Sequence, residues 1–261
     1  MKGHLEVAKA AAVRAGNILR ERISESREVA YKGEINLVTE MDRLSERIVV
    51  ETILETFPDH GILAEEEAQI KNSSGFLWII DPLDGTTNYA HGYPSFSVSI
   101  GLERTGDIVV GVVYDPMRDE LFSAERGQGA FLNGKPLAVS RTDVLIRSLL
   151  ATGFPYDRAV SRENNLNYFN ALIMASQEIR RSGSASLDLC ALAAGRLDGY
   201  WELKLHPWDV AAGSLIVQEA GGMVSDFTGT LFSIRDNELV ASNGRIHGLM
   251  LEILNTVKHK A

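Results

Sequence analysis

The sequence is short of the residues that mark several classes of protein. It has one cysteine, Cys190, in 261 residues, which excludes a disulfide framework within the chain and suits a reducing compartment such as the cytoplasm. We expect Cys190 to be a small core residue. No stretch approaches 18 uncharged apolar residues, so we expect no membrane span. The opening stretch MKGHLEVAKAAAVRAG carries Glu6 and no long apolar run, which predicts no signal peptide.

Positive charge is also scarce. Lys and Arg number 26 against 35 Asp and Glu, and the formal net charge is −9. This balance argues against a general nucleic-acid binder and against an anionic-membrane binder. It still allows an anionic substrate, because a bound metal ion can reverse the local sign of the potential.

The N-terminal part of the chain combines helix and strand patterns. Thr39 is a candidate N-cap, with Asp42 three residues on in a variant capping box. Asn133-Gly134 predicts a hairpin turn. The spacing of apolar residues predicts helices over 4–23 and 39–57, and strands over 76–80, 97–102, 108–114, 121–124 and 131–139.

Beyond about residue 145 strand and helix patterns alternate. The predicted strands are 148–152 and 198–203, and the predicted helices are 164–176, 184–195 and 209–222, the last starting at Asp209. The fold class predicted is α/β, with an N-terminal α+β half over residues 1–144 and a C-terminal α/β half over residues 145–261. We find no long linker, so the halves are expected to form one continuous catalytic unit.

The stretch WIIDPLDGTT, residues 78–87, concentrates chemistry at the end of a strand. An apolar run ends on Asp81, and a turn there would bring its carboxylate, that of Asp84 and the Leu83 carbonyl to one point. Such hard oxygen ligands suit Mg²⁺. Gly85 and Thr86 then offer backbone N–H groups of the kind that bind phosphate, at the start of a short helix. A capped Asp-Gly turn is the alternative, and it leaves the second aspartate unexplained.

Two more acidic places fit the same chemistry. Glu65, Glu66 and Glu67 follow a short apolar strand, although such a run is commonly a solvated face. Asp209 lies at a predicted helix start, where an N-cap aspartate is the alternative. Caps and surface charges do not explain why all three places lie at strand ends or helix starts.

Five segments resemble those of the inositol monophosphatase family, in order and over nearly the whole chain. DPLDGTTNY and WDVAAGSLIVQEAGG resemble its two signatures, and ILAEEE resembles its upstream glutamate motif. RRSGSASLDLCALAAGRLDGYWE resembles its substrate-side segment, and KGEINLVTEMD its N-terminal lysine-and-aspartate segment. The resemblance implies a layered αβαβα sandwich of the inositol monophosphatase and fructose-1,6-bisphosphatase type, with the site between the halves. It also implies a homodimer and inhibition by lithium.

Residue by residue, the resemblance implies a site for two or three Mg²⁺ ions. The implied metal ligands are Glu65, Asp81, Leu83 through its carbonyl, Asp84 and Asp209. The implied catalytic residues are Glu65, Asp84 and Thr86. The implied substrate-binding residues are Glu65, Leu83, Asp84, Gly85, Thr86, Gly183, Ser184, Ala185, Glu202 and Asp209. A register in which Glu66 replaces Glu65 stays open, and His91 and His206 are expected to be structural or rim residues.

The activity implied is Mg²⁺-dependent hydrolysis of a phosphate monoester, first of all inositol 1-phosphate, by in-line attack of a metal-activated water. Glu202 favours a polyol, because a carboxylate accepts hydrogen bonds from hydroxyl groups. Alternatives are a fructose-1,6-bisphosphatase, a histidinol-phosphatase, a bisphosphate nucleotidase, or a member with an added protein- or RNA-binding role. A haloacid-dehalogenase-type enzyme would carry Asp-x-Asp-Gly-Thr, and this chain has one residue too many. A catalytically idle member would lack an acidic ligand, and none is missing.

Overall fold

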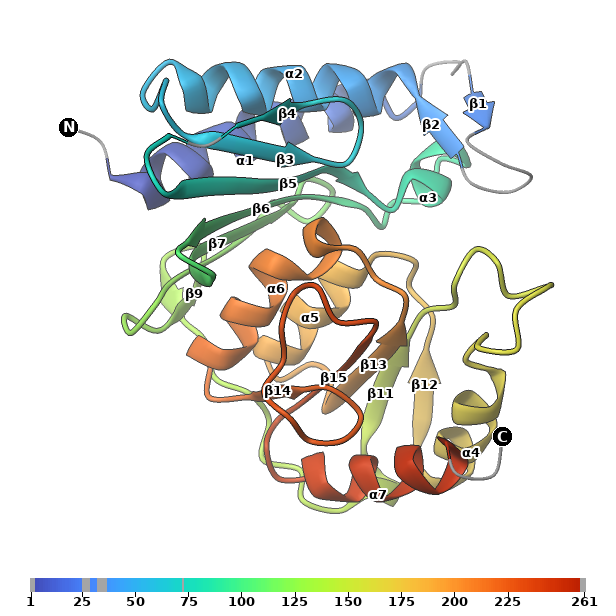
Figure 1. The fold of residues 1–261 in the computed structure, drawn as a ribbon. Helices are drawn as coiled ribbons and strands as arrows, with labels where there is room; N and C mark the ends of the chain where they lie inside the picture. The colour runs from blue at the N-terminus through green and yellow to red at the C-terminus, as the bar shows by residue number, and fades with distance from the viewer. Residues whose placement is uncertain (1–2, 25–28, 32–36, 72, 259–261) are drawn as a thin grey trace.

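The computed structural model describes residues 3–24, 29–31, 37–71 and 73–258. It is a five-layer sandwich in which helix pairs and sheets alternate (Figure 1). The αβαβα order expected from the resemblance is confirmed. No helix within these ranges is long and apolar enough to span a membrane. Residues 32–36, which belong to the lysine-and-aspartate segment, lie outside the described residues.

The first two layers are a helix pair and an eight-stranded sheet. The helices α1 (His4–Arg22) and α2 (Glu40–Leu54) bury apolar faces against the sheet, as their periodicity predicted. The strand order is β10-β9-β8-β7-β6-β5-β3-β4, antiparallel except where β3 and β5 run parallel. The bounds are β3 (Gly61–Ala64), β4 (Gln69–Ile70), β5 (Phe76–Asp84), β6 (Ser97–Arg104), β7 (Asp107–Asp115), β8 (Glu120–Glu125), β9 (Ala130–Leu132) and β10 (Lys135–Pro136). A separate pair, β1 (Val29–Tyr31) and β2 (Leu37–Thr39), leads into α2.

The middle layer is the helix pair α5 (Ala185–Ala193) and α6 (Pro207–Glu219), which lies between the two sheets (Figure 1). Both helices contribute to one core with the first sheet on one side and the second sheet on the other. Cys190 of α5 is fully buried in this core, as predicted. The predicted start of α6 at Asp209 is wrong by two residues, because Pro207 takes the first helical position, where its missing N–H costs nothing.

The last two layers are a five-stranded mixed sheet and an outer helix pair. The strand order is β12-β11-β13-β15-β14, with β11 (Leu149–Thr152) parallel to β12 (Glu178–Arg180) and β13 (Gly199–Leu203). β14 (Met223–Ser225) and β15 (Glu238–Ser242) complete it in antiparallel pairing. A 3₁₀ turn (Leu145–Arg147) precedes β11, and α4 (Leu166–Ala175) and α7 (His247–Lys258) pack together on the outer side.

Candidate active site

A bulge in β5 places both aspartates of the DPLD stretch on one face of the first sheet. Asp81 pairs with Ser99 of β6 and Asp84 pairs with Ser97, so β5 advances three residues against two. Because side chains alternate between the faces of a strand, the extra residue returns Asp84 to the face of Asp81. Leu83 packs on the opposite side, in the α1–α2 core. The expectation that a turn follows residue 80 is therefore wrong: the strand continues to Asp84, and the bulge gathers the carboxylates.

Asp84 connects the first sheet to the start of α5. Its Oδ2 accepts hydrogen bonds from the Ser184 hydroxyl at 2.7 Å, the Ser186 N–H at 2.8 Å and the Ser186 hydroxyl at 2.5 Å. Burial raises the pKa of Asp84, and these hydrogen bonds to the ionised form oppose the rise. The residue thus joins segments that are about one hundred positions apart in the chain.

Asp209 lies in the first turn of α6, three residues after the N-cap His206. Its Oδ2 accepts the backbone N–H of His206 at 2.7 Å, and its own N–H donates to the His206 carbonyl at 3.1 Å. This is the reciprocal arrangement of a capping box. The capping interpretation of Asp209 is thus partly correct, although the N-cap is His206, and Asp209 also borders the cavity described below.

Glu65 follows β3 and lies beside β5, where its backbone N–H donates to the Ile80 carbonyl at 3.2 Å. The buried carboxylate of Glu46 on α2 accepts the N–H groups of residues 66–68 at 2.9–3.0 Å, which fixes the turn after Glu65. Of the three consecutive glutamates, Glu65 is the one that borders the cavity among the described residues. The geometry therefore favours Glu65 over Glu66.

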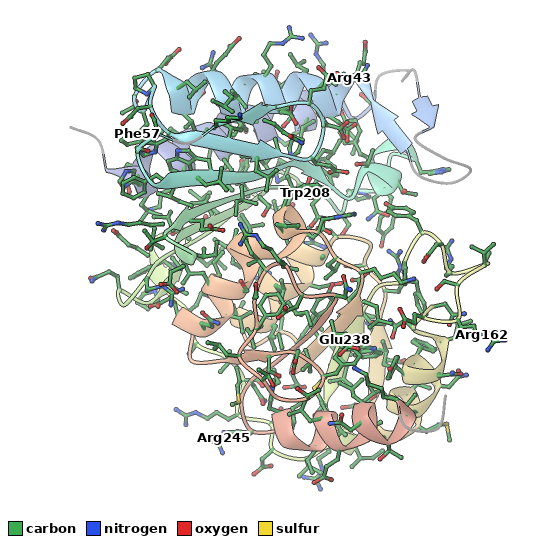
Figure 2. All side chains as sticks on the ribbon, viewed as in Figure 1. Arg43, Phe57, Arg162, Trp208, Glu238 and Arg245 are labelled. Atoms are coloured by element: carbon green, nitrogen blue, oxygen red, sulfur yellow. The ribbon has the colours of Figure 1, made fainter. Side chains whose placement is uncertain are left out.

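These segments enclose a cavity of about 520 Å³ between the two halves of the chain. A side cavity of about 100 Å³, which we call the annex, opens beside it and shares Asp84, Glu202 and Asp209 with it. Trp208 of α6 lies where the C-terminal half meets the first sheet, and its carbonyl accepts the Ser99 hydroxyl at 3.4 Å (Figure 2). The residues that border the main cavity include Glu65, Asp81, Leu83, Asp84, Gly85, Thr86, Gly183, Glu202 and Asp209, and Ser184 and Ala185 border the annex.

Burial and neighbouring carboxylates raise the pKa of Asp81 and of Asp209. For Asp81 burial is the largest cause, followed by the charges of Glu65, Asp84 and Asp209, and its pKa lies well above the usual range. For Asp209 burial comes first and the charge of Asp84 second. A bound divalent ion would offset this repulsion and favour the ionised forms of all four.

The donor set fits a hard divalent metal. Carboxylate oxygens and the Leu83 carbonyl are the oxygen ligands that Mg²⁺ prefers. As the side chains stand, no three His, Cys, Asp or Glu residues in the described ranges are grouped closely enough to hold an ion. The position of Asp84 contributes to this separation of the carboxylates, because its Oδ2 is turned toward α5.

Thr86 begins the short helix α3 (Thr86–Ala90) and contacts a buried aspartate of α2. Its hydroxyl lies 2.9 Å from Asp42 Oδ1 and 3.0 Å from the Leu83 carbonyl oxygen. Gly85 precedes it at φ 99°, and a Cβ there would lie 3.0 Å from the Ser95 carbonyl oxygen, so a larger residue is strained at this position. The sequence offered Asp42 as a capping residue, and its contact with Thr86 was not predicted.

Glu202 on β13 borders both cavities. The Tyr200 hydroxyl donates to Glu202 Oε2. Burial raises the pKa of Glu202 to about 7, against the lowering effect of that hydrogen bond and of the Arg181 charge. The two histidines lie at the surface: His91 is exposed, and His206 stacks on Trp208 at the rim of the main cavity with ring centroids 4.9 Å apart.

Comparisons with known proteins show which family and which relatives the chain is similar to. The model of the inositol monophosphatase family matches residues 2–259. The chain is 48% identical over 245 residues to an inositol-1-monophosphatase of Synechocystis sp., covering 93% of this chain and 85% of that protein. It is 43% identical over 250 residues to the Nus factor SuhB of Escherichia coli, covering 95% and 94%.

Solved structures give the same result. An inositol monophosphatase from Anabaena (Nostoc) sp. superposes with a TM-score of 0.88 at 45% identity, covering 97% of this chain and 95% of that one. The extragenic suppressor protein suhB from Bartonella henselae superposes with a TM-score of 0.91 at 40% identity, covering 95% and 97%.

Proposed function

Because this chain belongs to the inositol monophosphatase family, we propose that it hydrolyses a polyol phosphate monoester, with inositol 1-phosphate as the first candidate and Mg²⁺ as the metal. Family membership supports phosphatase activity and metal dependence in general. The resemblance also leads us to propose a homodimer, inhibition by lithium and a cytoplasmic location.

The observation that carries the proposal is the convergence of four carboxylates from separate elements on one cavity. Glu65 comes from the end of β3, Asp81 and Asp84 from the bulge of β5, and Asp209 from the first turn of α6. With the Leu83 carbonyl they would hold two or three Mg²⁺ ions. Bound divalent ions supply positive charge to phosphoryl oxygens and lower the pKa of water.

Thr86 would orient the attacking water. Its hydroxyl carries one proton, and donating that proton to Asp42 leaves the Thr86 oxygen free to accept a proton of a water molecule in the cavity. Glu65, which follows the neighbouring strand β3, would accept a proton from the same water as general base. Gly85 and Thr86 would hold the phosphate from their backbone, and Glu202 would face the alcohol part of the substrate.

The relatives named Nus factor SuhB suggest a second candidate, a binding role beside hydrolysis. It corresponds to the protein- or RNA-binding alternative stated from the sequence. The net charge of −9 does not favour RNA, so a protein partner is the form we propose for that role.

Phosphate release from a panel of monoesters tests the main proposal. Activity is expected with Mg²⁺ and not after exhaustive chelation, and inositol 1-phosphate is expected among the best substrates. Saturating Mg²⁺ should also raise the melting temperature, because an ion at 100 times its Kd stabilises the folded state by about 2.7 kcal/mol. Hydrolysis that survives chelation would refute the metal site.

A further inference from the structure

The annex beside the main cavity contains a buried carboxylate that the proposed reaction does not use. Asp188 lies in the first turn of α5 and is 5% exposed. Its Oδ1 accepts the Ser182 hydroxyl at 2.7 Å. Within the described residues Asp188 Oδ2 accepts no hydrogen bond, although the side chain borders the annex. A buried carboxylate oxygen without a partner is costly unless a ligand or water supplies the donor.

Glu202 approaches the same annex from β13 in a matching way. Its Oε2 accepts the Tyr200 hydroxyl, and its Oε1 accepts no hydrogen bond within the described residues. The carboxylate fits there because residue 153 is glycine: a Cβ at that position would lie 2.1–2.3 Å from the carboxylate atoms of Glu202. One oxygen of each carboxylate is thus fixed by the protein, and one remains to accept from a ligand.

The charges around the annex favour a ligand with hydroxyl groups over one with a second phosphate group. The charge of Glu202 raises the pKa of Asp188, and the charge of Arg181 lowers the pKa of both carboxylates. The Arg181 guanidinium folds over Gly183, since a Cβ on Gly183 would lie 2.9 Å from its Nη1. One guanidinium beside two buried carboxylates does not favour a second phosphate group. Hydroxyl groups can donate to both carboxylates without adding charge.

We propose that Asp188 is a specificity-determining residue, whose Oδ2 accepts a hydrogen bond from a hydroxyl group of the alcohol part of the substrate while Glu202 accepts from another. The annex has room for several water-sized groups, which is enough for the hydroxyl-bearing edge of a polyol. Asp188 therefore favours polyol monophosphates over esters without hydroxyl groups. The inference rests on the proposed function and extends it to a residue of α5.

The test compares two esters in three proteins. We define a selectivity ratio as kcat/KM for inositol 1-phosphate divided by kcat/KM for 4-nitrophenyl phosphate, which has no hydroxyl groups on its leaving part. Asp188→Asn should lower this ratio at least tenfold, mainly through KM for the polyol ester, which corresponds to about 1.4 kcal/mol. The control is Asp198→Asn. Asp198 is equally buried, at 7% exposed, but it bonds Ser140 and the Leu149 N–H away from both cavities.

Asp198→Asn should leave the ratio within twofold of that of the wild type. Ser182→Ala, which removes the hydroxyl that orients Asp188, should lower the ratio by a smaller factor and serves if Asp188→Asn does not fold. A wild-type enzyme that hydrolyses both esters, with an unchanged ratio in Asp188→Asn and in Ser182→Ala, would overturn the inference.

A binding measurement separates this inference from the proposed function. Saturation-transfer NMR with free inositol, in chelator and without turnover, should show contact with the wild type and a weaker signal with Asp188→Asn. If the wild type hydrolyses neither ester, the proposed function fails, and the NMR comparison alone decides the role of Asp188. Equal signals from the two proteins would then reject it.

Discussion

Replacing Glu202 by glutamine is expected to make the stability of the metal-free protein less dependent on pH. The pKa of Glu202 rises from its ordinary 4.5 to about 7 in the folded protein. A carboxyl group whose pKa is raised by folding stabilises the folded state fully below pH 4.5, and this contribution is lost as the pH rises to 7 and above. The loss reaches at most about 3 kcal/mol, because each pH unit of displacement corresponds to 1.36 kcal/mol. Since the carboxylate borders a cavity, we expect roughly 1–3 kcal/mol.

Thermal melts in chelator at pH 4.5 and pH 8.5 measure this effect. Glu202→Gln and wild type should melt at similar temperatures at pH 4.5, because both side chains are neutral there and both accept from Tyr200. At pH 8.5 the variant should melt higher, by roughly 2–4 °C per kcal/mol for a protein of this size. Glu178→Gln is the control: that carboxylate is 52% exposed, and its removal should change stability by no more than about 0.5 kcal/mol at either pH.

Tyr200→Phe sharpens the assay. Its hydroxyl favours the ionised form of Glu202, so its removal should raise the pKa of Glu202 further and enlarge the loss of stability at pH 8.5. A Glu202→Gln protein whose advantage over wild type is the same at both pH values would show that Glu202 ionises as freely when folded as when unfolded. The argument from burial would then be refuted.

Four other substitutions test the site and the core. Asp81→Asn should raise the melting temperature in chelator, because Asp81 is buried among like charges. Asp84→Asn should lower the melting temperature, with a loss of about 1 kcal/mol in the free energy of unfolding, since a neutral amide replaces the charged acceptor of three hydrogen bonds. Both should lose at least 100-fold in phosphate release, and equal shifts in the melts would contradict the assignment. Gly85→Ala should destabilise by about 1–3 kcal/mol through its positive φ, and a variant that melts like wild type would disprove the strain. Burial lowers the pKa of His60, whose Nδ1 accepts the Trp78 indole N–H at 3.0 Å, so the free energy of unfolding should fall as the pH drops below 6.5. His60→Phe should reduce the difference in stability between urea titrations at pH 5 and at pH 8. An unchanged difference would exclude His60 as its cause.

Periodicity located the elements that bury one regular face. The pattern over residues 4–23 predicted α1 within one residue of its end, and Asn133-Gly134 correctly marked the turn between β9 and β10. β15 and α7, toward the end of the chain, were not predicted. The start of α2 at Glu40 follows the predicted N-cap Thr39, whereas its end at Leu54 falls three residues short of the predicted one. The start of α6 was missed by two residues, because a proline, rather than apolar spacing, decides where that helix begins.

The candidate site was less accessible to sequence reasoning than the fold. The acidic residues were found because they stand at element ends next to specific motifs. Their partners were missed: Asp42, Ser186 and Asp188 lie inside helices, where a single sequence cannot tell a buried polar contact from a solvated one. The contacts of Asp42 with Thr86 and of Ser186 with Asp84 join residues 44 and 102 positions apart. Local sequence patterns do not predict contacts between residues so far apart in the chain.

The bulge in β5 makes strand register, as well as side-chain identity, a condition for the site. If the present β5 sequence paired with β6 without the bulge, every acidic residue would remain in the sequence, but Asp84 would lie three regular positions after Asp81. Asp84 would then point to the opposite face of the sheet, toward the apolar layer that holds Trp78, Ile80 and the helices α1 and α2. Burying a carboxylate there would cost several kcal/mol. Two aspartates separated by two residues therefore share a face only where the strand is bulged, whereas a homologue with one residue fewer between them could align both carboxylates on a regular strand.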